Sequence, residues 1–166
     1  MKNSKFIFSG IVLTIAILAQ IAGTFFHYNT LDNAFICNLG WVMLWISAVF
    51  GWLPIFTLKK WGGVPSGKSY METTRLVQSG VYAVVRHPQY LAGILMGIGL
   101  SLISQQWLVV LPGIVVIGLS YAATFAEERQ LLEKFPGLYQ EYQKKVPRVN
   151  FIAGFFRLLF CRKPSP

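Results

Sequence analysis

Long apolar runs without charged side chains alternate with short polar segments along this chain. Two of these runs lie within the first 58 residues, and each is long enough for a transmembrane helix, which needs about 20 mostly apolar residues. A third run, residues 89–126, is too long for one span, and its polar cluster at 104–106 predicts a tight turn. The pattern therefore predicts an all-α integral membrane protein with about four transmembrane helices, at 6–26, 35–58, 89–104 and 107–126.

Two further segments follow the predicted spans. From Leu131 to Val146 apolar residues recur at roughly helical spacing, which predicts amphipathic helices broken near Pro136: one helix to about residue 135 and a shorter one over about 136–145. The simplest interpretation is that this segment lies on the membrane surface. Residues 150–161 are strongly apolar but too short to span, so we expect an interfacial helix whose Arg157 extends toward water.

Composition supports the membrane assignment. Hydrophobic residues make up 54% of the chain and charged residues 13%, whereas soluble domains carry about 25% charged residues. The net charge of +9 does not indicate nucleic-acid binding, because the basic residues flank the apolar runs. Since no repeat or long linker divides the chain, we expect residues 1–166 to form a single membrane-embedded domain. Gly93, Gly97 and Gly99 are expected to let the third helix pack closely on its neighbours.

Lysine and arginine positions predict the orientation. None of the 15 basic residues lies in the 27–34 loop or the 104–106 turn. By the positive-inside rule, the N-terminus, the 59–88 loop and the C-terminal tail should face the cytoplasm. A cleaved signal peptide at 1–26 is the alternative, but its apolar stretch is longer than a signal core and no small-x-small cleavage site follows it. A retained anchor is therefore favoured.

Metal and disulfide chemistry are not expected. The chain has two cysteines, Cys37 and Cys161, without CxxC spacing, and its two histidines, His27 and His87, are far apart in the sequence. The predicted topology places the cysteines near opposite membrane faces, so we expect neither a zinc site nor a disulfide.

Two polar clusters need an explanation. Residues 74–90 precede the third predicted helix, and Glu127 and Glu128 follow the fourth. Because these helices form a hairpin, both clusters should meet at its cytoplasmic end. Adjacent carboxylates are unfavourable near a helix C-terminus and need a compensating cation, which is either Arg86 or a ligand.

Each residue of the first cluster also has a simple structural interpretation. Arg86 is a possible positive-inside anchor, His87-Pro88 a possible helix start, and Tyr82 and Tyr90 suit the membrane interface. Taken together with the glutamates, however, the set suits a ligand that carries an ammonium group, a carboxylate, a cationic centre and an aromatic ring. S-adenosylmethionine is one such molecule.

Two motifs carry a family resemblance. "LVQSGVYAVVRHPQY" (76–90) and "EERQLLEKFPGLYQEYQKKVPR" (127–148) resemble the signature of isoprenylcysteine carboxyl methyltransferases, a group related to phospholipid N-methyltransferases. The resemblance covers about residues 74–149. In the second motif the positions at the family spacing are Glu127, Glu128, Leu131, Phe135, Tyr139, Tyr142, Val146 and Pro147.

The resemblance implies S-adenosylmethionine binding without a Rossmann fold, in agreement with the absence of a G-x-G-x-x-G motif after a predicted strand. It implies direct methyl transfer to a lipophilic acceptor that enters from the bilayer. We expect Glu127 to hold the cofactor's ammonium, and Arg86 and His87 to act near its carboxylate or to order the loop. His87 or Glu128 would serve as base for an amine acceptor. The residues implied to line the cofactor site are Thr74, Arg75, Leu76, Val77, Tyr82, His87, Pro88, Gln89, Tyr90 and Glu127.

The chain also departs from the family pattern. Ala92 and Pro136 replace family glycines, and Ala123 stands where eukaryotic members carry an arginine thought to contact the carboxylate being methylated. The short form is similar to prokaryotic members, so we expect a location in the prokaryotic inner membrane. The alternatives left open are a phospholipid-amine N-methyltransferase, a small-thiol S-methyltransferase, and a non-enzymatic membrane scaffold or lipid-binding protein. The motifs do not fix the oligomeric state.

Overall fold

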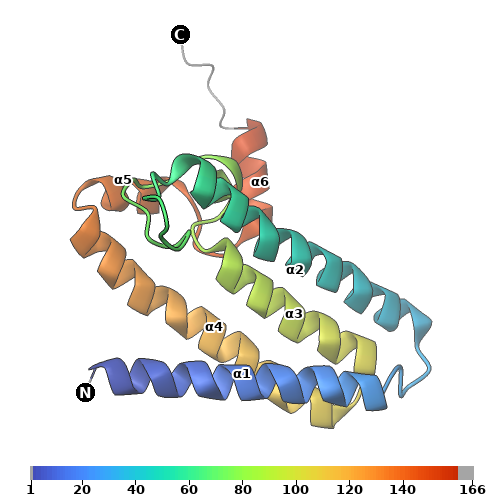
Figure 1. Ribbon diagram of the computed structural model, residues 1–166. Helices are drawn as coiled ribbons and strands as arrows, with labels where there is room; N and C mark the ends of the chain where they lie inside the picture. The colour runs from blue at the N-terminus through green and yellow to red at the C-terminus, as the bar shows by residue number, and fades with distance from the viewer. Residues whose placement is uncertain (1, 161–166) are drawn as a thin grey trace. The chain divides into compact units, whose positions relative to one another are not determined.

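The computed structural model describes residues 2–160, with side chains from residue 8 onward, and every regular element in that range is helical (Figure 1). The prediction of an all-α integral membrane protein is confirmed. The elements are α1 (Lys2–Phe26), α2 (Ala34–Trp61), the 3-10 helix η1 (Gly80–Ala83), α3 (Pro88–Ser104), α4 (Trp107–Lys134), α5 (Leu138–Lys145) and α6 (Phe151–Phe160).

Helix α4 continues well past the charged residues that end its apolar run. It passes through Glu127 and Glu128 to Lys134, because glutamate, glutamine, arginine and leucine are all good helix formers. It ends just before Pro136 and Gly137, and Gly137 has a φ of 75°, a left-handed conformation that favours glycine. The turn separates α4 from α5, as the position of the proline predicted.

Three helices in the described part of the chain are long and apolar enough to cross a membrane: Phe8–Phe26, Ala34–Trp61 and Trp107–Lys134. The third predicted span also forms a helix, α3, at the expected position. Its 17 residues rise only about 26 Å at 1.5 Å per residue, which is shorter than the usual apolar core of a bilayer. All four predicted helices therefore form, and three of them reach a full spanning length.

The helices are organised in two compact units. The first unit comprises the chain up to Val49 together with Tyr90–Ala123, and the second comprises Phe50–Gln89 together with the chain from Thr124 onward. Helices α2 and α4 therefore contribute their first part to one unit and their last part to the other.

In the first unit, glycines bring helix backbones close together. A Cβ atom on Gly99 of α3 would lie 2.9 Å from the carbonyl oxygen of Gly40 on α2, and one on Gly97 would lie 3.2 Å from that of Gly113 on α4. The glycines of α3 thus serve close packing, as predicted. Helix α1 lies across α3 (Figure 1), where Gln20 Nε2 donates a hydrogen bond to the Gly97 carbonyl at 2.8 Å.

The two loops that lack basic residues are bonded to each other in the same unit. The amide of Asn29 donates to the Ile103 carbonyl at 3.0 Å, and the Thr30 hydroxyl donates to the Ser104 carbonyl at 2.7 Å. Gln105, in the turn before α4, donates to the side chain of Asn29 at 2.7 Å. Both uncharged loops therefore lie at one end of the unit, as the predicted topology requires.

In the second unit, the segment after α4 packs into the protein rather than resting its apolar face on a membrane. Tyr139, Tyr142 and Val146 are buried and form a cluster with Leu76, Leu131, Leu132 and Phe135. The interpretation of a segment that merely lies on the membrane surface is therefore wrong for this face.

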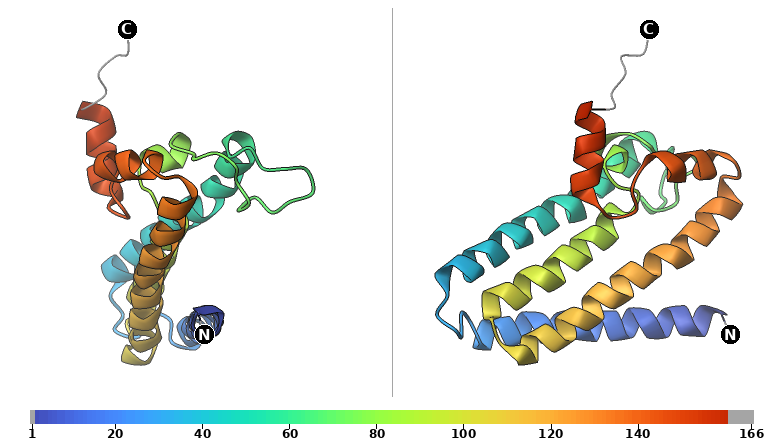
Figure 2. Two further views of the ribbon diagram at one scale, coloured as in Figure 1. Left: turned by 90° about the vertical axis from the view of Figure 1, so that its left-hand side faces the viewer. Right: turned by 180° about the vertical axis from the view of Figure 1, so that it is seen from behind.

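Helix α6 lies beside the segment that links η1 to α3 (Figure 2). Its Arg157 was expected to extend toward water, but the guanidinium instead donates a hydrogen bond to the carbonyl of Ala83. Cys37 is a buried free thiol. Cys161 lies outside the described residues, so the expectation about a disulfide stays a prediction.

Candidate functional site

The backbone around Arg86 and His87 is held by the segment after α5. Pro88 is fully buried and begins α3, where its missing N–H removes no helical hydrogen bond. Proline also keeps the preceding residue out of the helical conformation. The amides of Arg86 and His87 therefore bond outside the helix, to the carbonyls of Pro147 at 3.0 Å and Arg148 at 3.1 Å.

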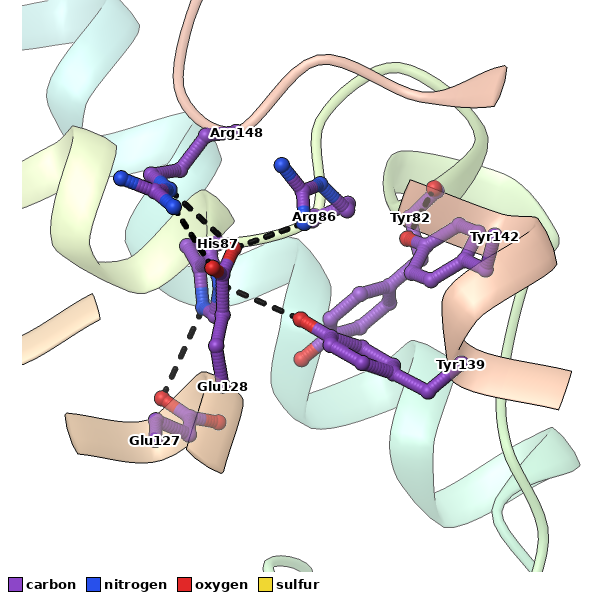
Figure 3. Close-up of polar contacts among 8 residues, drawn as sticks. All are labelled: Tyr82, Arg86, His87, Glu127, Glu128, Tyr139, Tyr142 and Arg148. Atoms are coloured by element: carbon purple, nitrogen blue, oxygen red, sulfur yellow. Dashed lines mark hydrogen bonds and ion pairs between the residues drawn. The ribbon is translucent and has the colours of Figure 1, made fainter. Parts of the chain in front are cut away.

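Glu128 is the centre of the polar contacts in this unit (Figure 3). Arg148 donates from Nε to Oε1 at 3.1 Å and from Nη2 to Oε2 at 2.6 Å. Arg86 Nη1 lies 2.7 Å from Oε1, and His87 Nε2 lies 3.1 Å from the same oxygen. The glutamate pair was expected to need a compensating cation, and Arg86 supplies one to Glu128.

These contacts decide what Glu128 can do. Its side chain is only 7% exposed, and burying a carboxylate is favourable only when its oxygens are well paired. Taking up a proton would weaken its contacts with two guanidinium groups. Glu128 therefore fits an organising role, and the expectation that it serves as a general base is not supported by this geometry.

His87 lies between the two glutamates. Its side chain is 1% exposed, with Nε2 toward Glu128 and Nδ1 3.7 Å from Glu127 Oε2, a distance too long for a hydrogen bond. The Tyr139 hydroxyl lies 3.4 Å from Nε2. The imidazole is therefore positioned from two sides, by α4 and by α5.

Glu127 differs sharply from its neighbour in the chain. Successive side chains on a helix point about 100° apart. The Glu127 side chain therefore points away from the side of α4 where the two arginines contact Glu128. Its side chain is 39% exposed, and among the described residues its closest polar contact is the one with His87. Glu127 therefore has carboxylate oxygens free to accept hydrogen bonds from a ligand.

Three tyrosines border this site. The Tyr142 hydroxyl donates to the Tyr82 carbonyl at 2.6 Å, and the rings of Tyr139 and Tyr142 have centroids 5.8 Å apart. Burial, reinforced by the charge of Glu127, raises the pKa of the Tyr82 phenol. Burial is also the main cause that raises the pKa of Tyr139 and of Tyr142. All three are therefore neutral phenols at physiological pH.

Arg86 has a buried donor without a partner. Its Nε is buried and has no hydrogen-bond partner within residues 8–160. Buried donors are normally satisfied, so an anionic group that approached this edge would be favoured. The partly exposed carboxylate of Glu127 and the buried, unpaired Nε of Arg86 have the opposite charges that the ammonium and carboxylate of an amino-acid moiety require. No group of three or more potential metal ligands occurs in the part of the chain that the structure describes.

The contacts of four other nominated residues stabilise the fold around the site. Thr74 donates from its hydroxyl to the Gly63 carbonyl at 2.8 Å, and the amide of Arg75 donates to Gly62 at 3.1 Å, so both hold the loop after α2. Leu76 packs against the tyrosine cluster and Val77 is buried.

Two nominated residues, Gln89 and Tyr90, lie in the first turn of α3. Gln89 donates to the Tyr70 hydroxyl at 3.2 Å, which links it to the loop after α2. Tyr90 is counted with the first unit, whereas Tyr82, Arg86, His87, Glu127 and Glu128 all belong to the second. The structure thus brings together the polar residues of both motifs within one unit.

Arg148 is the residue that the sequence did not nominate. Besides its bonds to Glu128, its guanidinium lies 3.9 Å from the centroid of the Phe125 ring on α4. It follows Pro147 in a segment without regular structure, so no helical periodicity marks it. The available signal was the cation at the end of the second motif, "VPR".

Comparison with known proteins adds an independent line of argument. The family model for phospholipid methyltransferase matches residues 35–137, which is more than half of the chain. The chain belongs to the phospholipid methyltransferase family. Protein-S-isoprenylcysteine O-methyltransferase B of Arabidopsis thaliana is a relative of this chain. The two are 25% identical over 146 residues, which cover 82% of this chain and 70% of the relative. No solved structure matches this chain.

These findings confirm the resemblance to this family. They identify the chain as a membrane methyltransferase. The matched range includes Arg86, His87, Glu127 and Glu128. It ends before Tyr139, Tyr142 and Arg148, which lie in the second motif and are connected to the site by their contacts.

Proposed function

We propose that this methyltransferase transfers a methyl group from S-adenosylmethionine to a lipophilic acceptor at the membrane. One observation carries the proposal: two separate sequence segments bring together a partly exposed carboxylate, Glu127, which lies near His87, and the neighbouring guanidinium of Arg86, whose buried Nε has no hydrogen-bond partner within residues 8–160. An amino-acid moiety needs this pair of opposite charges. S-adenosylmethionine supplies an electrophilic methyl group on a sulfonium centre.

The residues of the chain would bind and orient rather than react. Glu127 would accept hydrogen bonds from the ammonium, and the unpaired Nε of Arg86 would donate to the carboxylate. Tyr82 offers an aromatic surface next to Glu127, suited to a ring or to a cationic centre. Holding donor and acceptor in line accounts for a large part of the rate in such a transfer.

Glu128 would act through its neighbours. By pairing with Arg86 and contacting His87, it fixes both of these side chains. The proposed site residues are thus Glu127, Arg86, His87 and Tyr82, with Glu128 and Arg148 as positioning residues.

The acceptor is proposed from the same contacts. A carboxylate is nucleophilic at neutral pH without a base, whereas an amine or a thiol must first lose a proton. Since Glu128 is engaged with two arginines, the site favours a carboxylate on a lipophilic molecule. A phospholipid amine is the second candidate because the family model is that of phospholipid methyltransferases.

Donor binding tests the site. Purified protein in detergent should bind S-adenosylmethionine saturably, and Glu127→Gln should raise the dissociation constant about tenfold or more, equivalent to roughly 1.4 kcal/mol. Glu133→Gln is the matched control, because Glu133 is an exposed glutamate on the same helix. Lack of saturable binding by the wild type would exclude the donor; unchanged binding by Glu127→Gln would exclude the site.

Product analysis tests the acceptor. Protein in vesicles is supplied with methyl-labelled donor and, in separate reactions, with a prenylcysteine analogue, phosphatidylethanolamine or a small thiol. A methyl ester releases labelled methanol in mild base, whereas N-methyl and S-methyl products retain the label. Base-labile product supports the carboxylate, and base-stable product from the other acceptors overturns it. No labelled product with any acceptor would support a scaffold or lipid-binding protein instead.

We also propose the orientation from the charge pattern. The N-terminus, the 59–88 loop and the C-terminal tail would face the cytoplasm of a prokaryotic cell, with residues 1–166 acting as one domain of the inner membrane. The hydrogen bonds between the two uncharged loops support a common opposite face for them. Labelling of single cysteines placed at Ser66 and Thr30 by a membrane-impermeant reagent on intact cells should modify position 30 and spare position 66.

A further inference from the structure

Helix α6 turns its charge inward and its apolar residues outward. Arg157 is the single charged residue of this helix, and its guanidinium bonds to the carbonyl of Ala83. The opposite side is apolar, and its large side chains are between 49% and 79% exposed: Ile152, Phe155, Phe156, Leu159 and Phe160. A helix in water would present the reverse arrangement, with its charge outside.

The inward side of α6 is closely fitted to the protein. A Cβ atom on Gly154 would fall inside the van der Waals contact distance of the Val84 carbonyl oxygen, so only glycine allows this approach. The Phe151 ring packs against Phe50 of α2, with centroids 5.8 Å apart. The exposed apolar side is therefore a consequence of tight packing on the other side, and not of a loosely attached helix.

The contact with Phe50 indicates what covers the exposed side. Phe50 lies within a helix long and apolar enough to span a membrane, nine residues before Lys59 in its basic last turn. Nine residues rise about 14 Å along a helix. Helix α6 therefore begins on the apolar side of the level that Lys59 and Lys60 mark, which is the level of the lipid headgroups in a membrane protein.

The neighbouring part of α2 has the same character. Trp52, Leu53 and Phe56 are exposed there, as lipid-facing residues of a span are. We propose that the exposed side of α6 is buried in lipid at the cytoplasmic surface of the bilayer, and that this contact holds residues 83–87 in place. The partner is the acyl-chain and headgroup boundary of the membrane, a surface that takes up aromatic and aliphatic side chains.

The connection to residues 83–87 is direct. Helix α6 contacts Ala83 and Val84 through Arg157 and Gly154. The segment just before α6 accepts the amide hydrogen bonds of Arg86 and His87. Lipid that restrains α6 thus restrains the backbone of these two residues from both sides. That this matters for donor binding rests on the proposed function; the lipid contact itself does not.

Fluorescence quenching tests the lipid contact. A single cysteine at Phe156 or at Gln140 receives an environment-sensitive fluorophore, in a full-length chain with Cys37→Ala and Cys161→Ser, in vesicles of phosphatidylcholine and phosphatidylglycerol. Gln140 is the control because it is exposed on the polar face of α5. Lipid-borne quenchers should act at 156 and not at 140, and iodide in the water should act at 140 only. Iodide quenching at both positions overturns the proposal, as does energy transfer between labelled copies at 156, which would indicate a second copy as occupant.

Hydrogen exchange tests the restraint. In the same vesicles, the amide hydrogens of Arg86 and His87 should exchange about tenfold faster in the double variant Phe155→Ser/Phe156→Ser than in the wild type. The reason is that opening of the two amide hydrogen bonds requires α6 to move. Gln140→Ser is the control. Phe156→Ser alone should give a smaller effect, and unchanged exchange within α3 and α4 shows that each variant is folded. Unchanged exchange at 86 and 87 in folded variants overturns the restraint. Neither measurement uses S-adenosylmethionine, so a failure here is distinct from a failure of the proposed function.

Discussion

Arg148 binds both carboxylate oxygens of Glu128, from Nε at 3.1 Å and from Nη2 at 2.6 Å. The backbone carbonyl of the same arginine accepts the hydrogen bond of the His87 amide at 3.1 Å. One residue from an irregular segment therefore connects α4 to the segment that precedes α3. This connection holds Glu128 and His87 in contact.

Arg148→Ala should lower the stability of the protein by about 2 kcal/mol, less than the roughly 3–5 kcal/mol typical of a fully buried pair. The discount reflects the partial exposure of the Arg148 side chain, 24%, and the second cation, Arg86, that remains next to Glu128. Thermal unfolding in detergent should show a shift of about 5 °C. Arg129→Ala, an exposed arginine on α4, is the control and should leave the transition in place.

Removing both partners should be less harmful than the two single changes suggest. Glu128→Gln leaves Arg86 and Arg148 without their carboxylate, and Arg148→Met leaves that carboxylate with fewer donors. In the double variant only Arg86 is left without its carboxylate, so the loss of stability should be smaller than the sum by about 1–3 kcal/mol. Unfolding free energies of the four proteins measure this difference. Strict additivity would mean that the pair does not interact in solution.

The sequence predicted the helices well because two simple signals mark them. Uncharged runs define α1, α2 and the hairpin of α3 and α4, and the Pro136-Gly137 pair divides α4 from α5. The prediction that Arg157 extends toward water treated α6 as an isolated helix at a membrane surface, and the structure differs from it. A nearby carbonyl, that of Ala83, is a closer acceptor than water, and only the fold reveals it.

The candidate site was predicted in part. The predicted hairpin of α3 and α4 placed Arg86 and His87 next to the glutamates, since the two motifs border the same pair of helices. The sequence alone does not show that Glu128 is enclosed and Glu127 is open, because the burial of each depends on contacts with other segments. Arg148 lies outside any periodic element, so its role depends on a tertiary contact that no local pattern encodes.

Tyr142→Phe should change the alkaline stability. Burial, and then the neighbouring Tyr139 and Tyr82, raise the pKa of the Tyr142 phenol in the folded protein above the ordinary value of 10.0. The folded state therefore keeps this proton more tightly, so the contribution of the Tyr142 phenol to stability is fully present below pH 10.0 and is lost as the pH rises from there toward the folded pKa. The phenylalanine cannot ionise, so its alkaline decline should be shallower.

At neutral pH the same variant should be less stable than the wild type by about 1 kcal/mol, because the Tyr82 carbonyl loses its hydrogen bond. The two stability curves should therefore converge above pH 10.0. Thermal unfolding over a pH series measures both effects. Tyr28→Phe, at an exposed tyrosine, is the control and should run parallel to the wild type. Parallel curves for Tyr142→Phe would show that its phenol ionises equally in the folded and unfolded states.

Gly40→Ala tests the close packing of α2 on α3. The added Cβ would lie 2.7 Å from the Gly99 carbonyl oxygen and 2.8 Å from Ile103 Cγ1, and a backbone oxygen cannot move aside without displacing α3. We expect a loss of stability of about 1–3 kcal/mol. Gly118→Ala on α4 is the matched control, since a Cβ there meets nothing within 4 Å. Because alanine favours helix by up to about 1 kcal/mol over glycine, the control should be neutral or stabilising. Opposite signs for the two substitutions in detergent unfolding confirm the packing, whereas equal effects would show that α2 and α3 are not in contact at these glycines.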